Sequence, residues 1–416
     1  MILYNQLVTN SHYLGDYKMS YEKLQIMSDK NQGSFVRNLQ GATGTGFEEG
    51  THVHKDWWAK TKTYEQVMED AHVAVENRED ILIETKHISC ISDNNDFFFK
   101  LNDGRKFRPT DHAIEQFSVR AGVTSSSFLR EMRNIEDFDS HDANTMAIVG
   151  NNALRRIDSD KKFRLRTYTD GTCRAFVTDK YSPVDNRWYL ETLAEFIPGG
   201  RFSHWRGDED TIYGNILIPD TIMDYGSDDS DYGGMISVGN CEIGTRRISQ
   251  SPSLFRAICL NGCIWGQTSG EKIRKVHRGN IELDKLKLEI AQNIQQQIPL
   301  LAPGIRKFLE TRSLETGKAS IKGIIASVSS DYKLSKREAT EFLAQYGEFE
   351  AESRNLFGII NGLTRAGQKF DNSTWVRFDE IAGSLMDTSA DRWATILRRA
   401  DTFTDKDYEK VFSLTA

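Results

Sequence analysis

Residues 161–178 read KKFRLRTYTDGTCRAFVT, and this stretch is the clearest structural signal in the sequence. Two runs rich in β-branched and aromatic residues flank Asp170–Gly171, a pair typical of a type I′ turn, whose two central residues need positive φ. A period of two puts Phe163 and Leu165 on one strand face, and pairing across the turn sets Leu165 opposite Phe176. The stretch therefore predicts a β-hairpin with an apolar core face.

The other face of the first predicted strand is basic. Three cations and one aromatic ring share it, at Lys162, Arg164, Arg166 and Tyr168. Such a surface would follow the phosphates of a nucleic acid while Tyr168 stacks on a base. An ordinary solvated strand face gives the same pattern. These four residues are therefore candidate nucleic-acid contacts.

A second hairpin is predicted over residues 255–266, FRAICLNGCIWG, with Asn261–Gly262 as its turn. A two-residue turn there would place Cys259 and Cys263 on opposite sheet faces, so the two thiols would not share a zinc ion. Three cations near this hairpin are also candidate phosphate contacts, namely Arg246, Arg247 and Arg256. If the two hairpins share a sheet, these cations extend the first basic surface. Otherwise they are scattered surface charges balanced by neighbouring acids.

Helical patterns occur between the hairpins and after them. The run PTDHAIEQFSVRAG predicts a helix that starts at Pro109 and Thr110 and stops at Gly122. Further along, Ser335 and Glu338 form a capping-box pattern, in which each residue pairs with a free backbone N–H of the first turn. Both ends of the first helix and the start of the later one are therefore marked in the sequence.

These patterns predict an α+β fold, with a mixed or antiparallel sheet body and packed helices, followed by a helical C-terminal region. The helical part begins near residue 281, after which apolar residues repeat every four positions at Leu286, Ile290 and Ile294. We divide the chain into an N-terminal arm at 1–60, an α+β body at 61–280 and a helical region at 281–416.

Composition narrows the class of protein. The 416 residues carry a formal net charge of -7, which argues against indiscriminate coating of duplex DNA but allows a local basic groove. Five cysteines and the absence of a secretory leader pattern indicate reduced thiols in a cytoplasm rather than a disulfide framework. No window approaches the roughly eighteen apolar residues that a membrane span needs. We therefore expect a cytoplasmic protein that does not cross a membrane.

No complete catalytic motif is present. GATGTG at 41–46 lacks the Gly-Lys-Ser/Thr of a phosphate-binding loop, and neither GxSxG nor HExxH occurs. His52 and His54 alone form a weak metal site, and the acidic loop at 224–231 lacks the spacing of a calcium-binding loop. We therefore predict a protein that is not an enzyme and that holds no cofactor and no metal.

Three segments carry a family resemblance. They are FRPTDHAIEQFSVRAGVTSSSFLREM at 107–132, RAFVTDKYSPVDNRWYLETL at 174–193 and GNCEIGTRRISQSPSLFRAICLNGCIWG at 239–266. In this order they resemble the phage/plasmid-like proteins grouped as domain of unknown function 932, over roughly residues 60–370. The family's signature of an arginine, a cysteine and an Asn-Gly pair would fall on Arg256, Cys259, Asn261 and Gly262.

Two later segments also look like landmarks of that family, VHRGN at 276–280 and NLFGIINGLTR at 355–365. The resemblance implies an origin in a mobile element and a setting among DNA-processing and recombination genes. It implies no established activity and no agreed catalytic residues. It therefore favours nucleic-acid handling by association rather than by a physical argument.

The leading hypothesis is a non-catalytic phage or plasmid protein that binds single-stranded DNA, with strand annealing in recombination or replication as its activity. Annealing proteins hold the backbone in a charged groove across several subunits, so a homo-oligomer is expected. The alternative is an accessory or anti-defence protein that acts by binding a host protein. A metal-dependent nuclease is a third possibility, which rests only on the acidic loop and the two histidines.

Overall fold

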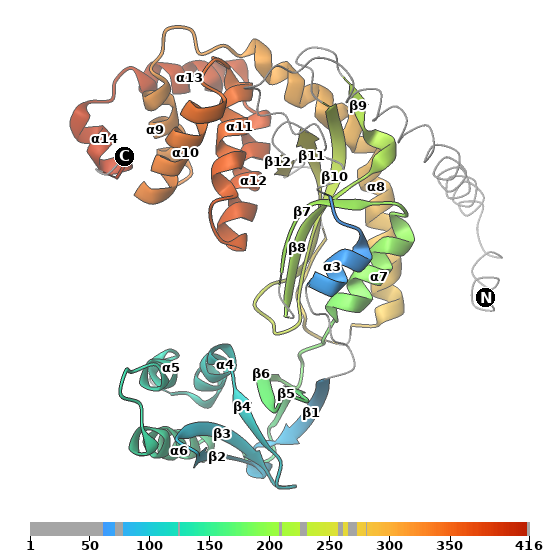
Figure 1. Cartoon of the computed structure of the whole chain (residues 1–416), viewed down its shortest axis with the longest axis vertical. Helices are drawn as coiled ribbons and strands as arrows, with labels where there is room; N and C mark the ends of the chain where they lie inside the picture. Colours follow the sequence, from blue (N-terminus) through green and yellow to red (C-terminus); the bar gives the residue numbers. More distant parts are fainter. Residues whose placement is uncertain are drawn as a thin grey trace, which may run out of the picture.

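The computed structural model describes residues 61–70, 78–123, 125–207, 210–224, 231–256, 261–264, 273–279 and 281–413. The predicted arm at 1–60 lies outside them. Two mostly antiparallel sheets occupy the first part of the described chain, and helices follow in the C-terminal part (Figure 1). The predicted α+β class is confirmed.

The first sheet has six strands in the order β1-β5-β6-β4-β3-β2, and all neighbours are antiparallel except β4 and β6. Helices α4 (Asp111–Ala121), α5 (Phe128–Arg133) and α6 (Ser140–Leu154) cover one face of it. The strands are β1 (Arg78–Glu84), β2 (Ile88–Asp93), β3 (Asp96–Leu101), β4 (Lys106–Pro109), β5 (Lys162–Tyr168) and β6 (Thr172–Thr178), with the 3-10 turn η3 (Thr85–His87) between β1 and β2.

The β5–β6 hairpin has the predicted register but a different turn. Leu165 pairs with Phe176, and both are buried under α4 in a cluster of phenylalanines. Gly171 has a φ of 81°, but Asp170 does not have positive φ, so the predicted type I′ turn is wrong. The strands are joined instead through three residues, and the ladder shifts by one residue between Arg166 and Thr167. This bulge offsets the extra turn residue and restores the predicted pairing.

A two-residue turn with positive φ at both positions occurs elsewhere, between β2 and β3. Asn94 and Asn95 have φ of 48° and 59°, and they join the pair Asp93–Asp96. Asparagine tolerates this left-handed conformation better than most residues, because its short side chain can hydrogen-bond locally. The Asn-Asn pair was thus a hairpin signal that the sequence analysis did not use.

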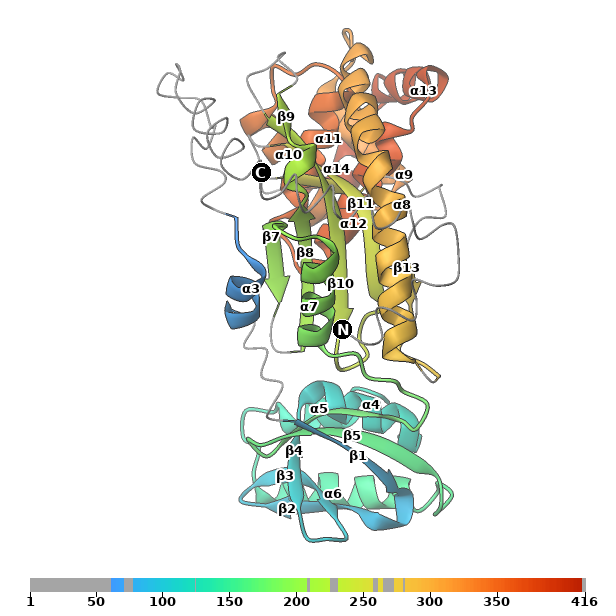
Figure 2. The same ribbon diagram turned by 90° about the vertical axis from the view of Figure 1, so that its right-hand side faces the viewer.

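The second sheet has seven strands, with the path β12-β11-β10-β8-β7, β13 beside β11 and β9 beside β10. One face is covered by α3 (Tyr64–Asp70), α7 (Asn186–Phe196) and the long α8 (Leu283–Glu310), as Figure 2 shows. The strands are β7 (Arg201–Gly207), β8 (Thr211–Leu217), β9 (Met223–Asp224), β10 (Asp231–Cys241), β11 (Ile248–Arg256), β12 (Asn261–Ile264) and β13 (Ile273–Lys275), with the 3-10 turn η4 (Pro219–Thr221) before β9.

Asn261 and Gly262 lie in β12, where they pair with Arg256 and Phe255, so the predicted turn at Asn261–Gly262 is wrong. The connection at 257–260 includes Cys259 and lies outside the described residues. The two hairpins also belong to different sheets. The condition under which their cations would form one continuous basic surface is therefore not met.

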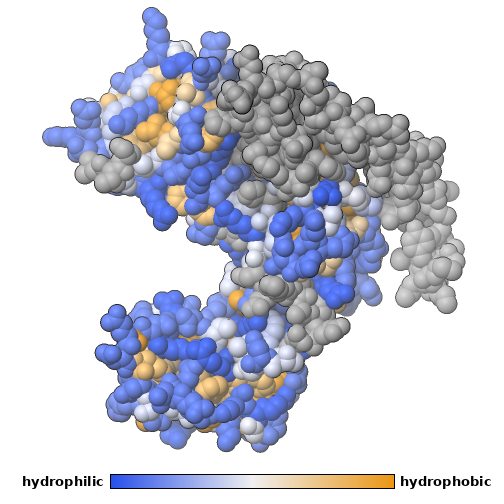
Figure 3. Space-filling model, in the orientation of Figure 1, coloured by the Kyte–Doolittle hydropathy of each residue, from blue (hydrophilic) through white to orange (hydrophobic). Residues whose placement is uncertain are grey.

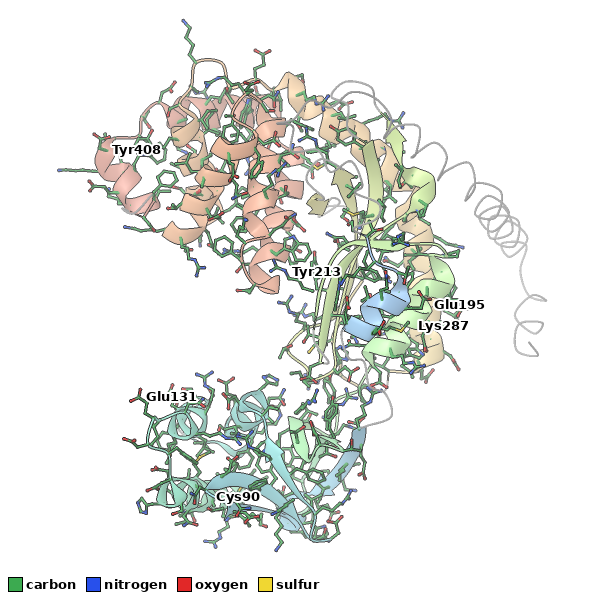
Figure 4. The ribbon with its side chains drawn as sticks, viewed as in Figure 1. Cys90, Glu131, Glu195, Tyr213, Lys287 and Tyr408 are labelled. Atoms are coloured by element: carbon green, nitrogen blue, oxygen red, sulfur yellow. The ribbon has the colours of Figure 1, made fainter. Side chains whose placement is uncertain are left out.

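Helix α8 belongs with the second sheet. Its predicted apolar stripe is buried, but Leu286, Ile290 and Ile294 pack with the face of the second sheet formed by β10 and β11 rather than with the C-terminal helices. Lys287 of α8 also pairs with Glu195 of α7 at 2.6 Å, on the same side of the sheet (Figure 4). The division of the chain at residue 281 therefore separates a helix from the sheet it covers.

The remaining helices form a bundle whose core also includes Tyr232 of β10 and Leu254 of β11. Ile324, Phe342, Ile360, Phe378 and Trp393 are buried together in it. The predicted capping box is confirmed at the start of α10. The bundle consists of α9 (Ile321–Asp331), α10 (Lys336–Phe349), α11 (Leu356–Gly367), α12 (Asn372–Met386), α13 (Ala390–Ala400) and α14 (Asp405–Val411), and it follows the 3-10 turn η5 (Thr311–Ser313). Among the described helices, none has the length and apolarity to cross a membrane.

Candidate nucleic-acid interface

Arg166, a predicted phosphate contact, lies in a buried ionic network between the two sheets. None of its side chain is exposed. Its Nε lies 3.1 Å from Asp80 Oδ1, and its Nη2 lies 2.9 Å from Asp185 Oδ1. Its Nη1 donates to the main-chain oxygen of Glu242 at 2.6 Å, and Arg78 pairs with the Glu242 carboxylate at 3.0 Å. These contacts join β1 and β5 of the first sheet to the β10–β11 turn of the second.

The opposite charges in this network stabilise one another's ionised forms against the effect of burial. Burial alone would lower the pKa of Arg166, but Asp80 and Glu242 raise it above its ordinary value. Burial raises the pKa of Glu242, against the lowering effect of Arg166 and Arg78. A phosphate could reach Arg166 only if the two sheets separated. We call this set (Arg78, Asp80, Arg166, Asp185 and Glu242) the sheet junction.

Tyr168 also lies at this junction. Its side chain is mostly buried, and its hydroxyl donates to Asp210 Oδ1 at 3.3 Å. The Arg174 guanidinium lies over its ring, 4.0 Å from the ring centre. Burial, with help from Asp210, raises the pKa of Tyr168 above its ordinary value. One ring face is therefore already covered by a cation, and in this arrangement the ring does not offer the open stacking surface that the base contact requires.

Lys162 and Arg164 are the two members of the predicted β5 set that face solvent. Lys162 is about half exposed, and its Nζ lies 4.0 Å from Glu84. Arg164 is half-buried. The predicted basic strand face is thus reduced to these two cations, because the far end of the same face is covered by the second sheet.

Arg256 occupies a second buried ionic contact, between β11 and the helical bundle. Its Nη1 lies 3.1 Å from Glu350 Oε1, and its guanidinium lies 4.8 Å from the centre of the Phe357 ring. Burial raises the pKa of Glu350, while Arg256 and then Arg365 oppose that rise. Arg256 therefore joins the second sheet to the bundle, and it is not exposed to a phosphate backbone here.

Arg246 and Arg247 differ from the other candidates because they remain accessible. They lie in the turn between β10 and β11, where Arg246 is half-buried and Arg247 is exposed. Neither forms an ion pair within the part of the chain that the structure describes. The turn itself is fixed by Gln116 of α4, whose Nε2 donates to the Ile243 oxygen at 2.7 Å, and by Tyr181, whose hydroxyl donates to the Glu242 oxygen at 2.8 Å.

A third arginine lies near this turn. His112 of α4 has its Nε2 3.3 Å from the Ile243 oxygen. Burial lowers the pKa of His112, and the nearby charge of Arg120 acts in the same direction. Arg120 is half-buried and donates to the Gln116 oxygen at 2.9 Å. Arg120 thus adds a positive charge at the end of α4, the helix that contacts the β10–β11 turn.

This turn lies beside a hollow in the molecule. Figure 3 shows the hollow between the unit of the first sheet and the C-terminal bundle, with a largely hydrophilic border. Tyr213 of β8 lies on the side of the second sheet that faces α12, and its ring meets Trp375 of α12 edge-on at 4.8 Å (Figure 4). Burial raises the pKa of Tyr213, and Arg246 is close enough to oppose the rise. Arg246 follows β10, the strand that pairs with β8 beside Tyr213.

The described residues give no support to a metal centre. They contain no group of three or more His, Cys, Asp or Glu side chains placed to hold a metal ion. His52 and His54 lie outside the described residues, as do Asp228 and Asp229 of the acidic loop. Cys90, Cys173 and Cys241 are buried and unpaired, and burial raises the pKa of the Cys173 thiol to about 12, which keeps it unreactive.

Sequence reasoning missed the partners of the predicted cations. Asp80, Asp185 and Glu242 come from a strand, a helix start and a turn that are far apart in the chain. The alternation in β5 correctly placed Arg166 opposite the core face, but it carried no information about what covers that second face. The sequence signal for these partners was limited to the carboxylate residues themselves, such as Asp80 in β1 and Asp185 at the start of α7.

A scan against protein-family models and searches of curated proteins and of solved structures found no match to this chain. The resemblance to the phage/plasmid-like family remains a prediction from the sequence.

Proposed function

We propose that the protein binds single-stranded nucleic acid in the hollow, with Arg246 and Arg247 as its central phosphate contacts and strand annealing as its activity. The observation that carries this proposal is that these two neighbouring arginines are accessible and form no ion pair within the described chain. They stand on a turn fixed by hydrogen bonds from α4 and Tyr181, and no described carboxylate neutralises them. Arginine presents a planar set of donors that matches phosphate oxygens.

The charge distribution favours a single strand over a duplex. The chain as a whole is acidic, with a net charge of -7, so a long duplex would meet repulsion beyond the local basic site. Arg120 lies near the same turn, so a short run of phosphates could meet three positive charges. A flexible single strand can follow such a local site without bringing a second backbone along acidic surface.

Fluorescence anisotropy with labelled single-stranded and duplex DNA, titrated across salt, tests the proposal. Binding should be tighter for the single strand and should weaken with salt. The double variant Arg246→Gln, Arg247→Gln should bind at least about ten-fold more weakly, and its salt slope should fall by about 1.4, or 0.7 for each lost phosphate contact. The annealing activity is then measured as the rate at which complementary labelled strands pair.

The matched control is Lys162→Gln, Arg164→Gln, which removes one exposed and one half-buried cation from β5 and should leave affinity unchanged. Loss of binding in this control, with normal binding in the turn variant, would move the site to the β5 face. No binding by the wild-type protein at low salt would refute the proposed function altogether.

A second candidate, binding of a host protein as an accessory or anti-defence factor, has its own supporting observation. Helices α4 to α6 and the connection between α5 and α6 expose large apolar side chains, namely Val119, Phe128, Ile135 and Ile148, which are 42% to 63% exposed. Exposed apolar residues on one layer of a unit are typical of protein contacts when they form a patch. A stoichiometric host partner that is lost in Val119→Glu and Ile148→Glu variants, with no retained nucleic acid, would favour this function.

A further inference from the structure

Helix α12 faces the second sheet, as does the neighbouring helix α11. Trp375, near its start, packs edge-on against Tyr213 of β8. On its other side α12 lies against α11, where a side chain at Gly367 would come within 2.8 Å of the Phe378 side chain. Asp379 follows Trp375 by one helical turn, so the two side chains lie on the same part of the helix surface. Asp379 therefore sits in the contact region between the bundle and the sheet.

Asp379 is completely buried and has no partner. Its exposed fraction is 0%, and neither carboxyl oxygen accepts or donates a hydrogen bond. No ion pair neutralises it within the described chain. A charged carboxylate in such a position would be strongly unfavourable, because it has lost its water and gained nothing in exchange. The contact can hold this side chain only in its neutral form.

The charged and titratable groups around Asp379 leave it without compensation. Glu380, its neighbour in α12, adds to the effect of burial, and together they raise the pKa of Asp379 well above its ordinary value. On β8 the facing group is Tyr213, which is itself neutral, and Arg246 lies near that tyrosine. The described cations of the packed elements are engaged elsewhere: Arg365 of α11 lies 3.9 Å from Glu350, and Arg206 of β7 donates to the carbonyls of Gln368 and Phe370.

We propose that the contact between α12 and the second sheet is a proton-controlled latch, which closes when the Asp379 carboxyl takes up a proton and opens when it loses one. In the open state the exposed carboxyl has its ordinary pKa of about 3.9. The closed state is therefore fully favoured below that pH and loses stability as the pH rises toward the raised pKa of the buried group. In this window the opening constant rises about ten-fold for each pH unit.

Opening would expose a polar and aromatic surface that the closed contact hides. On β8 and β10 this surface carries Tyr213, Asn215 and Ser237, and Ser237 donates to Asn215 Oδ1 at 2.5 Å. The Asn215 amide nitrogen has no partner when the latch is closed. The latch thus controls access to one wall of the hollow, and this inference does not depend on what the hollow binds.

Hydrogen exchange of the full-length protein, measured by mass spectrometry on peptides from α12, tests the latch. Exchange is followed at pH 5, 6 and 7 and corrected for the intrinsic rate at each pH. Protection of α12 in the wild-type protein should fall by up to about ten-fold per pH unit. In Asp379→Asn, which keeps the shape but cannot ionise, protection should be independent of pH.

Glu380→Gln is the matched control, because it removes a neighbouring carboxyl that is not fully buried, and it should keep the wild-type slope. A flat profile in the wild-type protein would overturn the proposal, and so would the same slope in Asp379→Asn. If Asp379→Asn does not fold, as judged by circular dichroism, Asp379→Leu offers a side chain of similar size without a titratable proton.

Discussion

The sheet junction and the latch both bury ionisable groups completely, but the group at the junction is paired and charged whereas the group at the latch is unpaired and neutral. At the junction, Arg166 is 0% exposed, and three carboxylate residues surround it, so its charge is kept. At the latch, Asp379 is also 0% exposed but has no partner, so its charge is given up. Pairing keeps a contact insensitive to pH near neutrality, whereas neutralisation makes it depend on the proton concentration.

The difference also separates a fixed contact from an adjustable one. The sheet junction holds the β10–β11 turn, and with it Arg246 and Arg247, at a constant position beside α4. The latch positions α12 on the other side of the same sheet. The two walls of the hollow are therefore expected to respond differently to the same change in conditions.

The largest effect should come from breaking the sheet junction. Arg166→Met leaves Asp80, Asp185 and Glu242 without their shared cation, and it should lower the free energy of unfolding by about 3–5 kcal/mol. Chemical denaturation followed by circular dichroism measures this loss. A change of less than about 1 kcal/mol would show that the junction is solvated rather than buried.

His277 should produce the next largest effect, on the acid side. It is buried and stacked on Tyr181 at 5.5 Å, and burial lowers its pKa to about 4. Its contribution to stability is complete above its unfolded pKa of about 6.5 and is lost as the pH falls toward 4, by about 3 kcal/mol in total. The variant His277→Gln should lack this part of the acid sensitivity in denaturation at pH 7, 5.5 and 4. An unchanged acid profile would contradict a neutral, buried imidazole.

Asp379 should show the opposite dependence, which sharpens the comparison with the paired carboxylates. Between pH 5 and 7 the wild-type protein should lose up to about 2.7 kcal/mol of stability relative to Asp379→Asn, at about 1.4 kcal/mol per pH unit. Denaturation of both proteins across this range measures the difference. Parallel curves for the two proteins would place the Asp379 carboxyl in contact with water or with a cation.

The smallest effect is expected at the exposed end of the same strand that carries Arg166. Lys162→Ala removes a side chain that is about half exposed and lies 4.0 Å from Glu84, so stability should change by no more than about 0.5 kcal/mol. Thermal unfolding at low and high salt provides the measurement. A loss comparable with that of Arg166→Met would mean that the whole strand face is covered.

The elements that the sequence predicted well are those defined by local chemistry. Thr110 caps α4 by accepting from the Ala113 N–H, and Gly122 ends it with a φ of 68°, as their residue types indicated. The pairing of Leu165 with Phe176 followed from alternation alone. The prediction of a turn at Asn261–Gly262 was wrong because strand pairing with β11 outweighed the local preference of an Asn-Gly pair for a turn.

The candidate site was less predictable, because it depends on which surfaces cover each other. Alternation identified one side of β5 as basic but could not show that the second sheet covers Arg166 and leaves Lys162 exposed. Arg246 and Arg247 were correctly noted as cations, yet their exposure depends on a turn held by distant residues. Asp379 gave no signal, since an aspartate within a helix is ordinary until its surroundings are known.

The strand order of the first sheet has a consequence for how the chain folds as it is made. β1 pairs with β5, so the pair Ile81–Leu165 can form only after Leu165 has been synthesised. The parallel pairing of β4 with β6 can form only later still. Contacts between such distant segments form slowly, and the early strands leave the ribosome as unpaired edges. Glu242 follows β10 in the chain, so β6, α7 and β7 to β10 are synthesised before it. Arg166 therefore acquires its last partner well after its own strand has appeared. A nascent chain that stalls between these two points would present Arg166 paired with Asp80 but without its contacts to Glu242, and this interval is where we expect chaperones to be needed most.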